Sequence, residues 1–192
     1  MKLPVFISVL LFLFSLTAHA QPGEQQQFEK EAQAAIKEFA SSLKTALLSA
    51  MQDGGPVEAV AVCNLIAPTL AAEMTKKHGL DISRTSLKIR NPQNEADEWE
   101  TSVLQQFETR LKSGEAIQSL TFSEKVKTNT GQQWRMMKAI PTDKVCLACH
   151  GTKIAPPVQA NLDKYYPDDM ATGFKLRDIR GAFTVSKDIN PQ

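Results

Sequence analysis

The sequence predicts an α+β fold in which helices come first and an antiparallel sheet follows. Up to about residue 112, apolar residues recur mainly at steps of three and four, which is the period of a helix face. From about residue 119 onward, short apolar runs alternate with polar residues and are separated by a turn signal, as in paired strands. Helical and strand segments that follow each other in blocks favour this class over a parallel α/β sheet.

The first helix is expected from Glu24 to about Met51, a stretch without Gly or Pro. Its apolar stripe has helical spacing and consists of Phe28, Ala32, Ala35, Ile36, Phe39, Leu43, Leu47 and Met51. We interpret this stripe as core packing or a helix–helix seam, and not as part of a cofactor site.

A second helix is expected after Pro56, ending at His78-Gly79. Its apolar face carries Val60, Cys63, Ala67, Leu70 and Met74, which puts the thiol of Cys63 on the buried side. Pro68 lies inside this pattern and should kink the helix or free a backbone carbonyl.

The remaining elements follow from local signals. Residues Ser83 to Arg90 are expected to be extended, and Asp97 to Lys112 should form a third helix. Asp97, Glu98 and Glu100 occupy its first turn, where negative charge opposes the positive end of the helix dipole. A hairpin with a turn at Asn129-Thr130-Gly131 is expected between Ser119 and Ile140, and a last strand from Gly181 to Ile189. The Ala155-Pro156-Pro157 run is interpreted as a break.

Residues 1–20 have the features of a signal peptide. Lys2 precedes an apolar run from Val5 to Leu16, and Ala18-His19-Ala20 is a small-x-small cleavage site. We therefore expect an exported, periplasmic protein with an N-terminal helical segment at 21–54 and a domain at 55–192. No later stretch is expected to cross a membrane. Loss of Lys2 lowers the formal charge from +1 to 0, which argues against a nucleic-acid partner.

The strongest motif is C-L-A-C-H at residues 146–150. C-x-x-C-H is the attachment signature of a c-type haem, in which two thiols bond the vinyl groups and the imidazole ligates the iron. Cys146 and Cys149 are the expected thioether sites and His150 the expected iron ligand. An exported chain is compatible with this assignment, because c-type haem is attached outside the cytoplasm in bacteria.

Cys63 is the third cysteine and is left without a partner. It could be a small core residue, form an intermolecular disulfide or ligate the iron. Other residues could fill the sixth iron position: His78, Met74, Met136, Met137 and Met170. A solvated helix end explains His78, and gap-filling explains the methionines.

Basic residues in flanking segments could pair with haem propionates: Arg84, Lys88, Arg90, Arg135 and Lys138. Tyr165, Tyr166 and Pro167 could cover an edge of the porphyrin.

Several separated motifs, in order, resemble those of the PAS-like c-type haem domain family: Cys63-Asn64 with Ala67-Pro68, residues 84–88 and 90–92, residues 97–100, the CLACHG run, Gly173-Phe174 and residues 180–183. The resemblance extends from about Phe28 to Ile189. It implies a PAS-like antiparallel sheet with flanking helices and one covalent haem c. Carried over residue by residue, it makes Cys63 the axial ligand opposite His150.

A thiolate opposite a histidine should lower the reduction potential relative to a methionine ligand. The function that we expect is therefore a redox or diatomic-gas sensing module that acts through a protein partner. The alternative is a soluble periplasmic electron-transfer cytochrome. We do not expect an enzyme, because a haem peroxidase needs distal acid–base residues and His78 is the one histidine besides His150 after cleavage.

Overall fold

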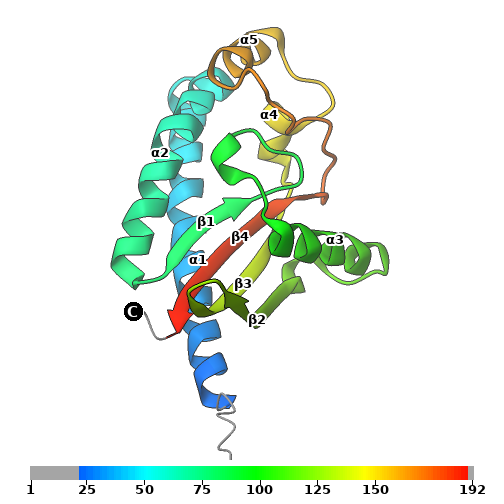
Figure 1. The fold of residues 1–192 in the computed structure, drawn as a ribbon. Coiled ribbons are helices and arrows are strands. Elements are labelled where there is room, and N and C mark those ends of the chain that lie inside the picture. Colours follow the sequence, from blue (N-terminus) through cyan, green and yellow to red (C-terminus); the bar gives the residue numbers. More distant parts are fainter. Residues whose placement is uncertain (1–21, 190–192) are drawn as a thin grey trace, which may run out of the picture.

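A four-stranded antiparallel sheet forms the centre of the computed structural model, which describes residues 22–189 (Figure 1). The strand order is β1-β4-β3-β2. The strands are β1 Asp81–Thr85, β2 Thr121–Thr128, β3 Gly131–Pro141 and β4 Ile179–Ile189. The α+β class is confirmed, and the signal peptide expected at residues 1–20 lies outside the described part.

The hairpin between β2 and β3 has the expected position. Thr128 pairs with Gly131, so Asn129 and Thr130 form a two-residue loop. Gly131 has a φ of 153°. The last strand starts at Ile179, slightly earlier than expected, and pairs with both β1 and β3. The segment expected to be extended over 83–90 is a strand only at its start, because pairing with β4 ends at Thr85.

Helices α1 Pro22–Asp53 and α2 Gly55–His78 form an antiparallel hairpin against one face of the sheet (Figure 1). The turn between them is tight, and Gly55 adopts a φ of 70° that favours glycine. Gly79 ends α2 in the left-handed conformation, as the His78-Gly79 signal predicted. α2 continues through Pro68 as one helix.

The first half of the α1 stripe packs on the sheet. Phe28, Ala32, Ala35, Ile36 and Phe39 are buried in one cluster with Trp134, Met136, Phe183 and Val185. The Phe28 and Trp134 rings are stacked at 6.1 Å, and Phe39 meets Phe183 edge to face at 5.6 Å. For these residues the interpretation as core packing is confirmed.

Helix α3, Glu98–Lys112, covers the opposite sheet face through Val103, Leu104 and Phe107. Because side chains alternate along a strand, Met136 faces α1 and Met137 faces α3. Asp97 caps α3 in a capping box with Glu100, which accounts for two of the three acidic residues by a structural role.

The short elements between β3 and β4 lie beyond one end of the sheet: α4 Leu147–His150 and α5 Pro156–Tyr165. The described residues also include the 3₁₀ helices η1 Pro92–Asn94, η2 Ile117–Ser119 and η3 Lys144–Cys146. The interpretation of residues 155–157 as a break is wrong in one respect. Pro156 and Pro157 begin α5, where a missing N–H costs no helical hydrogen bond.

The outer face of α2 is apolar and partly exposed. Leu65 and Ile66 are 65% and 40% exposed. By length and composition alone, α2 could cross a membrane, so the expectation that no stretch after the leader meets this criterion is wrong. In the fold α2 packs against α1, α5 and β1. The criterion does not assign a membrane role, because core helices also satisfy it.

We predict that Phe39→Ala lowers the free energy of unfolding by about 3–5 kcal/mol, because it opens a cavity between α1 and β4. Urea denaturation of the variant and the wild type in the same haem-loading state measures this loss. Leu48→Ala on the same helix is the control: Leu48 is 40% exposed, and its truncation should cost about 0.5 kcal/mol or less. Equal losses for both variants would contradict the assigned packing.

Candidate functional site

A cavity of about 330 Å³ lies where the α1–α2 hairpin extends past the end of the sheet. Its apolar wall on α1 is formed by Leu43, Leu47 and Met51. The expectation that the whole α1 stripe serves packing is therefore wrong for its last three members. The opposite wall comes from the sheet ends and from residues 143–150. A volume of this size with mostly apolar walls is typical of a small-molecule or cofactor site.

The four residues singled out in the sequence all line this cavity: Cys63, Cys146, Cys149 and His150. Cys63 comes from α2, and the other three come from η3 and α4. All three cysteines are free and half-buried, so Cys63 faces the cavity and is not packed in the core. Burial raises the pKa of the Cys63 thiol, and the nearby Arg84 guanidinium opposes that shift.

The turn that carries the CLACH motif needs a glycine directly after it. A Cβ at Gly151 would lie 2.5 Å from the Leu147 carbonyl oxygen. The backbone N–H of Gly151 donates to that same carbonyl at 3.0 Å and closes α4. This close approach fixes His150 at the cavity wall, next to Cys149.

The contacts of the His150 ring indicate which of its two nitrogens carries the proton. Its Nδ1 lies 2.7 Å from the Ala171 carbonyl oxygen, which can only accept, so Nδ1 carries the proton and donates. Nε2 therefore keeps the lone pair, and the Arg90 and Arg180 guanidiniums approach it at 3.4 Å each. Arg180 Nε also lies 3.2 Å from Nδ1, but a protonated Nδ1 has no lone pair with which to accept from it. Burial holds the pKa of His150 well below its usual value, and the Arg180 and Arg90 charges lower it further. A neutral imidazole is the form that binds a metal.

Three arginines line the cavity, and they differ in their partners. Arg90 forms a buried ion pair with Asp169, with Nη2 2.8 Å from Oδ2. Neither Arg84 nor Arg180 has a carboxylate oxygen within 4.0 Å among residues 22–189. Burial, with the charges of Arg90 and Arg84, lowers the pKa of Arg180 to about 10. In this described part, Asp143 is the one carboxylate of the cavity lining.

The basic residues expected to pair with propionates are only partly brought together. Arg84 and Arg90 line the cavity, whereas Lys88, Arg135 and Lys138 do not. Arg135 instead pairs with Asp97 and Glu100 on the α3 side of the sheet. Arg180 also lines the cavity, but it was not among the cations expected at the site, although it directly precedes the last expected strand.

The alternative sixth ligands lie elsewhere. His78 pairs with Glu38 on α1 at 3.0 Å and does not line the cavity. Met74, Met136 and Met137 are buried in the cores, and Met170 is 56% exposed. Met51 is a thioether in the cavity lining that the sequence analysis did not weigh. Of the two tyrosines considered, Tyr166 lines the cavity, whereas Tyr165, the last residue of α5, packs against the cluster of Val60, Val158 and Leu162.

The residues present fit a haem c. Two thiols and an imidazole stand in the order that covalent attachment needs, and another thiol lines the same cavity. Within residues 22–189, Arg84 and Arg180 line the cavity without a carboxylate partner and match the two acidic groups of a haem, whereas the third such cation, Lys44, is exposed. The apolar wall on α1 matches the apolar ring of a haem. Burying a cation without an opposite charge is unfavourable, so an anionic ligand in the cavity would lower this free-energy cost.

Comparisons with known proteins agree with this picture. Residues 18–187 match the family model described as Tll0287-like. Among solved structures, the crystal structure of the cyanobacterial heme-protein Tll0287 is similar, with a TM-score of 0.59 and 23% identity. The match covers 90% of this chain and 99% of that chain, and at this identity it concerns the fold. No curated protein matches the sequence. The family match confirms the resemblance drawn from the separated motifs.

We predict that Arg84→Met stabilises the ligand-free chain by about 1 kcal/mol, because it removes a buried charge that has no carboxylate partner. The measurement is urea denaturation in a Cys146→Ser/Cys149→Ser background. Lys37→Met, at an exposed position on α1, should change the free energy of unfolding by about 0.5 kcal/mol or less. A clear loss of stability in Arg84→Met would show that Arg84 is already compensated without a ligand.

Proposed function

The chain belongs to the Tll0287-like family, and on that basis we propose that it is an exported protein carrying one covalent haem c in the cavity. One observation carries the proposal. Cys63 lies 83 positions before Cys146 in the sequence, yet it lines the same cavity as Cys146, Cys149 and His150. The similar solved structure is that of a haem protein, which supports the same ligand class.

In this proposal Cys146 and Cys149 form the thioether bonds and His150 ligates the iron through Nε2. The Nδ1–H bond to the Ala171 carbonyl orients the ring and makes the imidazole a stronger donor. Arg84 and Arg180 receive the propionates, and Leu43, Leu47 and Met51 keep water from the ring. The bound haem would supply one-electron redox chemistry and, where the Cys63 ligand leaves the iron, affinity for a diatomic gas.

We propose that Cys63 is the second axial ligand and that the protein is a redox or diatomic-gas sensing module acting through a partner. A thiolate ligand should give a low reduction potential, which suits sensing better than periplasmic electron transfer. The alternative is a soluble electron-transfer cytochrome. A clearly positive midpoint potential with a thioether ligand would favour that alternative.

We propose that this haem site does not catalyse a reaction. A peroxidase would need a distal acid–base group, and His150 is the one histidine in the cavity lining of residues 22–189. Saturable turnover of peroxide with an electron donor that persists in Cys63→Ala would favour an enzyme instead.

We predict that Cys146→Ser/Cys149→Ser abolishes covalent haem, because both thioether bonds need thiols. The measurement is haem-dependent peroxidase staining after denaturing electrophoresis of protein exported with its own leader. Cys63→Ser is the matched control and should keep the stained band. A band that survives in the double variant would refute the covalent assignment.

We predict that Cys63→Ala converts the ferric haem to a five-coordinate or water-ligated form, because the thiolate ligand is lost. Optical and paramagnetic-resonance spectra of the purified holoprotein in both oxidation states measure this. Met51→Leu, which removes the thioether of the same cavity, should leave the spectra unchanged. The reverse pattern would move the ligand from Cys63 to Met51.

A further inference from the structure

We infer that Arg90 and Asp169 form a positioning pair for His150, which fixes the orientation of the proximal ring and thereby the reduction potential of the iron. Neither residue is an iron ligand or a propionate partner in this inference. It rests on the proposed function, because it concerns the environment of the haem ligand. It assigns a role to an ion pair that the proposed function leaves without one.

The pair itself is well defined. Arg90 donates through Nε at 3.0 Å and through Nη2 at 2.8 Å to the same carboxylate oxygen, Oδ2 of Asp169. The two side chains are 9% and 7% exposed. Breaking a buried pair by neutralising one partner is costly, because the other charge stays buried. Asp169 therefore holds the Nε and Nη2 edge of the guanidinium, whereas Nη1 lies 3.4 Å from His150 Nε2.

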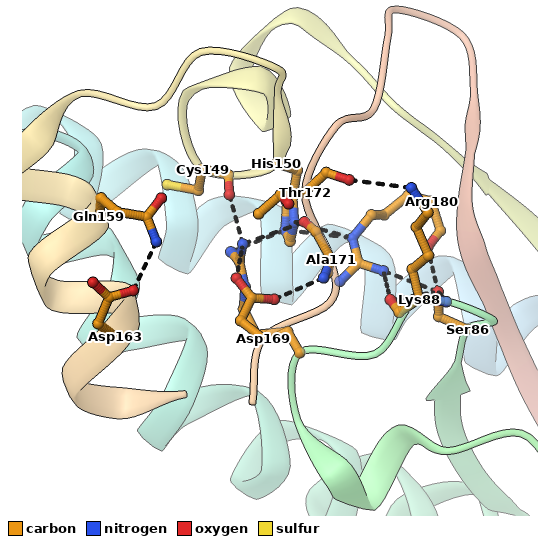
Figure 2. A network of polar contacts seen from close by, with 11 residues as sticks. Ser86, Lys88, Cys149, His150, Gln159, Asp163, Asp169, Ala171, Thr172 and Arg180 are labelled. Atoms are coloured by element: carbon orange, nitrogen blue, oxygen red, sulfur yellow. Dashed lines mark hydrogen bonds and ion pairs between the residues drawn. The ribbon is translucent and has the colours of Figure 1, made fainter. Parts of the chain in front are cut away.

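Asp169 and Arg90 act on the His150 ring through the backbone of one residue, Ala171. Oδ1 of Asp169 accepts from the Ala171 N–H at 2.8 Å, which fixes the backbone of the 169–171 segment. The carbonyl of Ala171 then accepts from His150 Nδ1 at 2.7 Å and from Arg90 Nη2 at 3.3 Å. Figure 2 shows Asp169, Ala171 and His150 along this line of contacts.

The same guanidinium also holds the turn that carries the cysteines. Arg90 Nη2 donates to the Cys149 carbonyl at 2.6 Å. Two backbone hydrogen bonds also connect this turn to the segment after Asp169. The Phe174 N–H donates to the His150 carbonyl at 2.9 Å, and the Gly173 N–H donates to the Gly151 carbonyl at 3.0 Å. The segment from Asp169 to Phe174 thus clamps the CLACH turn from one side, with the ion pair at its start.

The chemical consequence concerns the strength of the Nδ1–H bond. A firm bond to a carbonyl increases the electron donation of the imidazole and stabilises the oxidised iron. Asp169→Asn places an amide N–H or a neutral oxygen against Arg90, so the guanidinium and the Ala171 carbonyl lose their fixed positions. The Nδ1–H bond then weakens, and the reduction potential rises.

The test compares holoproteins with two different buried ion pairs removed. Asp169→Asn should raise the ratio of reduced to oxidised haem, measured at the wild-type midpoint potential, by about tenfold. Loss of such a partner costs about 10–100-fold in the affinity of a ligand set for its metal, and here the loss acts mainly on the oxidised iron. The ferric paramagnetic-resonance lines of this variant should broaden. Glu100→Gln is the control: it breaks the pair with Arg135 on the α3 side of the sheet, whose side chains are 9% and 13% exposed. It should lose stability without a change in potential.

A second variant covers the case in which Asp169→Asn does not fold. Arg90→Lys keeps the charge opposite Asp169 but cannot reach two carbonyls at once, so it should raise the potential in the same direction. Unchanged potentials and spectra in folded Asp169→Asn or Arg90→Lys would overturn the positioning role. Absence of covalent haem from the wild type would instead refute the proposed function, and the wild-type spectrum reports this first.

Discussion

The cavity exists because α1 is longer than the part of the sheet on which it packs. A helix of 32 residues spans about 48 Å, whereas the buried contact from Phe28 to Phe39 uses about 18 Å of it. The excess length carries Leu43, Leu47 and Met51 past the sheet end. α2 returns from the tight turn at Gly54-Gly55 alongside it and brings Cys63 to the same level. The site is thus a consequence of an overhanging helical hairpin closed by the CLACH turn.

The cavity lining also carries more positive than negative charge. Its lining includes three arginines, and Asp169 neutralises Arg90 alone. A fold selected only for stability would avoid the other two cations, since burial without a partner is unfavourable. Their presence is the expected cost of a site that is complete only with an acidic ligand. Arg84 and Arg180 come from neighbouring strands, β1 and β4, so pairing in the sheet also sets their spacing.

Much of the fold follows from local sequence signals. The α1 and α2 periodicities, the acidic start of α3 and the turn at Asn129-Thr130 each depend on residues a few positions apart, and the structure has each of them. Helix α5 was missed because the Pro-Pro pair was interpreted as a break, although proline is also common in the first turn of a helix. The α1 stripe was assigned one role, although its two halves face different surroundings. A periodic pattern indicates which face is apolar, but not what that face contacts.

The sequence by itself determined the chemistry of the site: two thiols and an imidazole in the order Cys146, Cys149, His150, and a third thiol at Cys63. These are properties of residue types and short spacings. Only the tertiary structure decided that Arg180 shares a cavity with them, that Arg135 and Lys138 do not, and that the Ala171 carbonyl sets the His150 tautomer. It also brings Cys63 to the same cavity, which the residues alone left open and the family resemblance implied. Such contacts join residues from 21 to more than 80 positions apart. They depend on how helices and strands pack, which local signals do not encode.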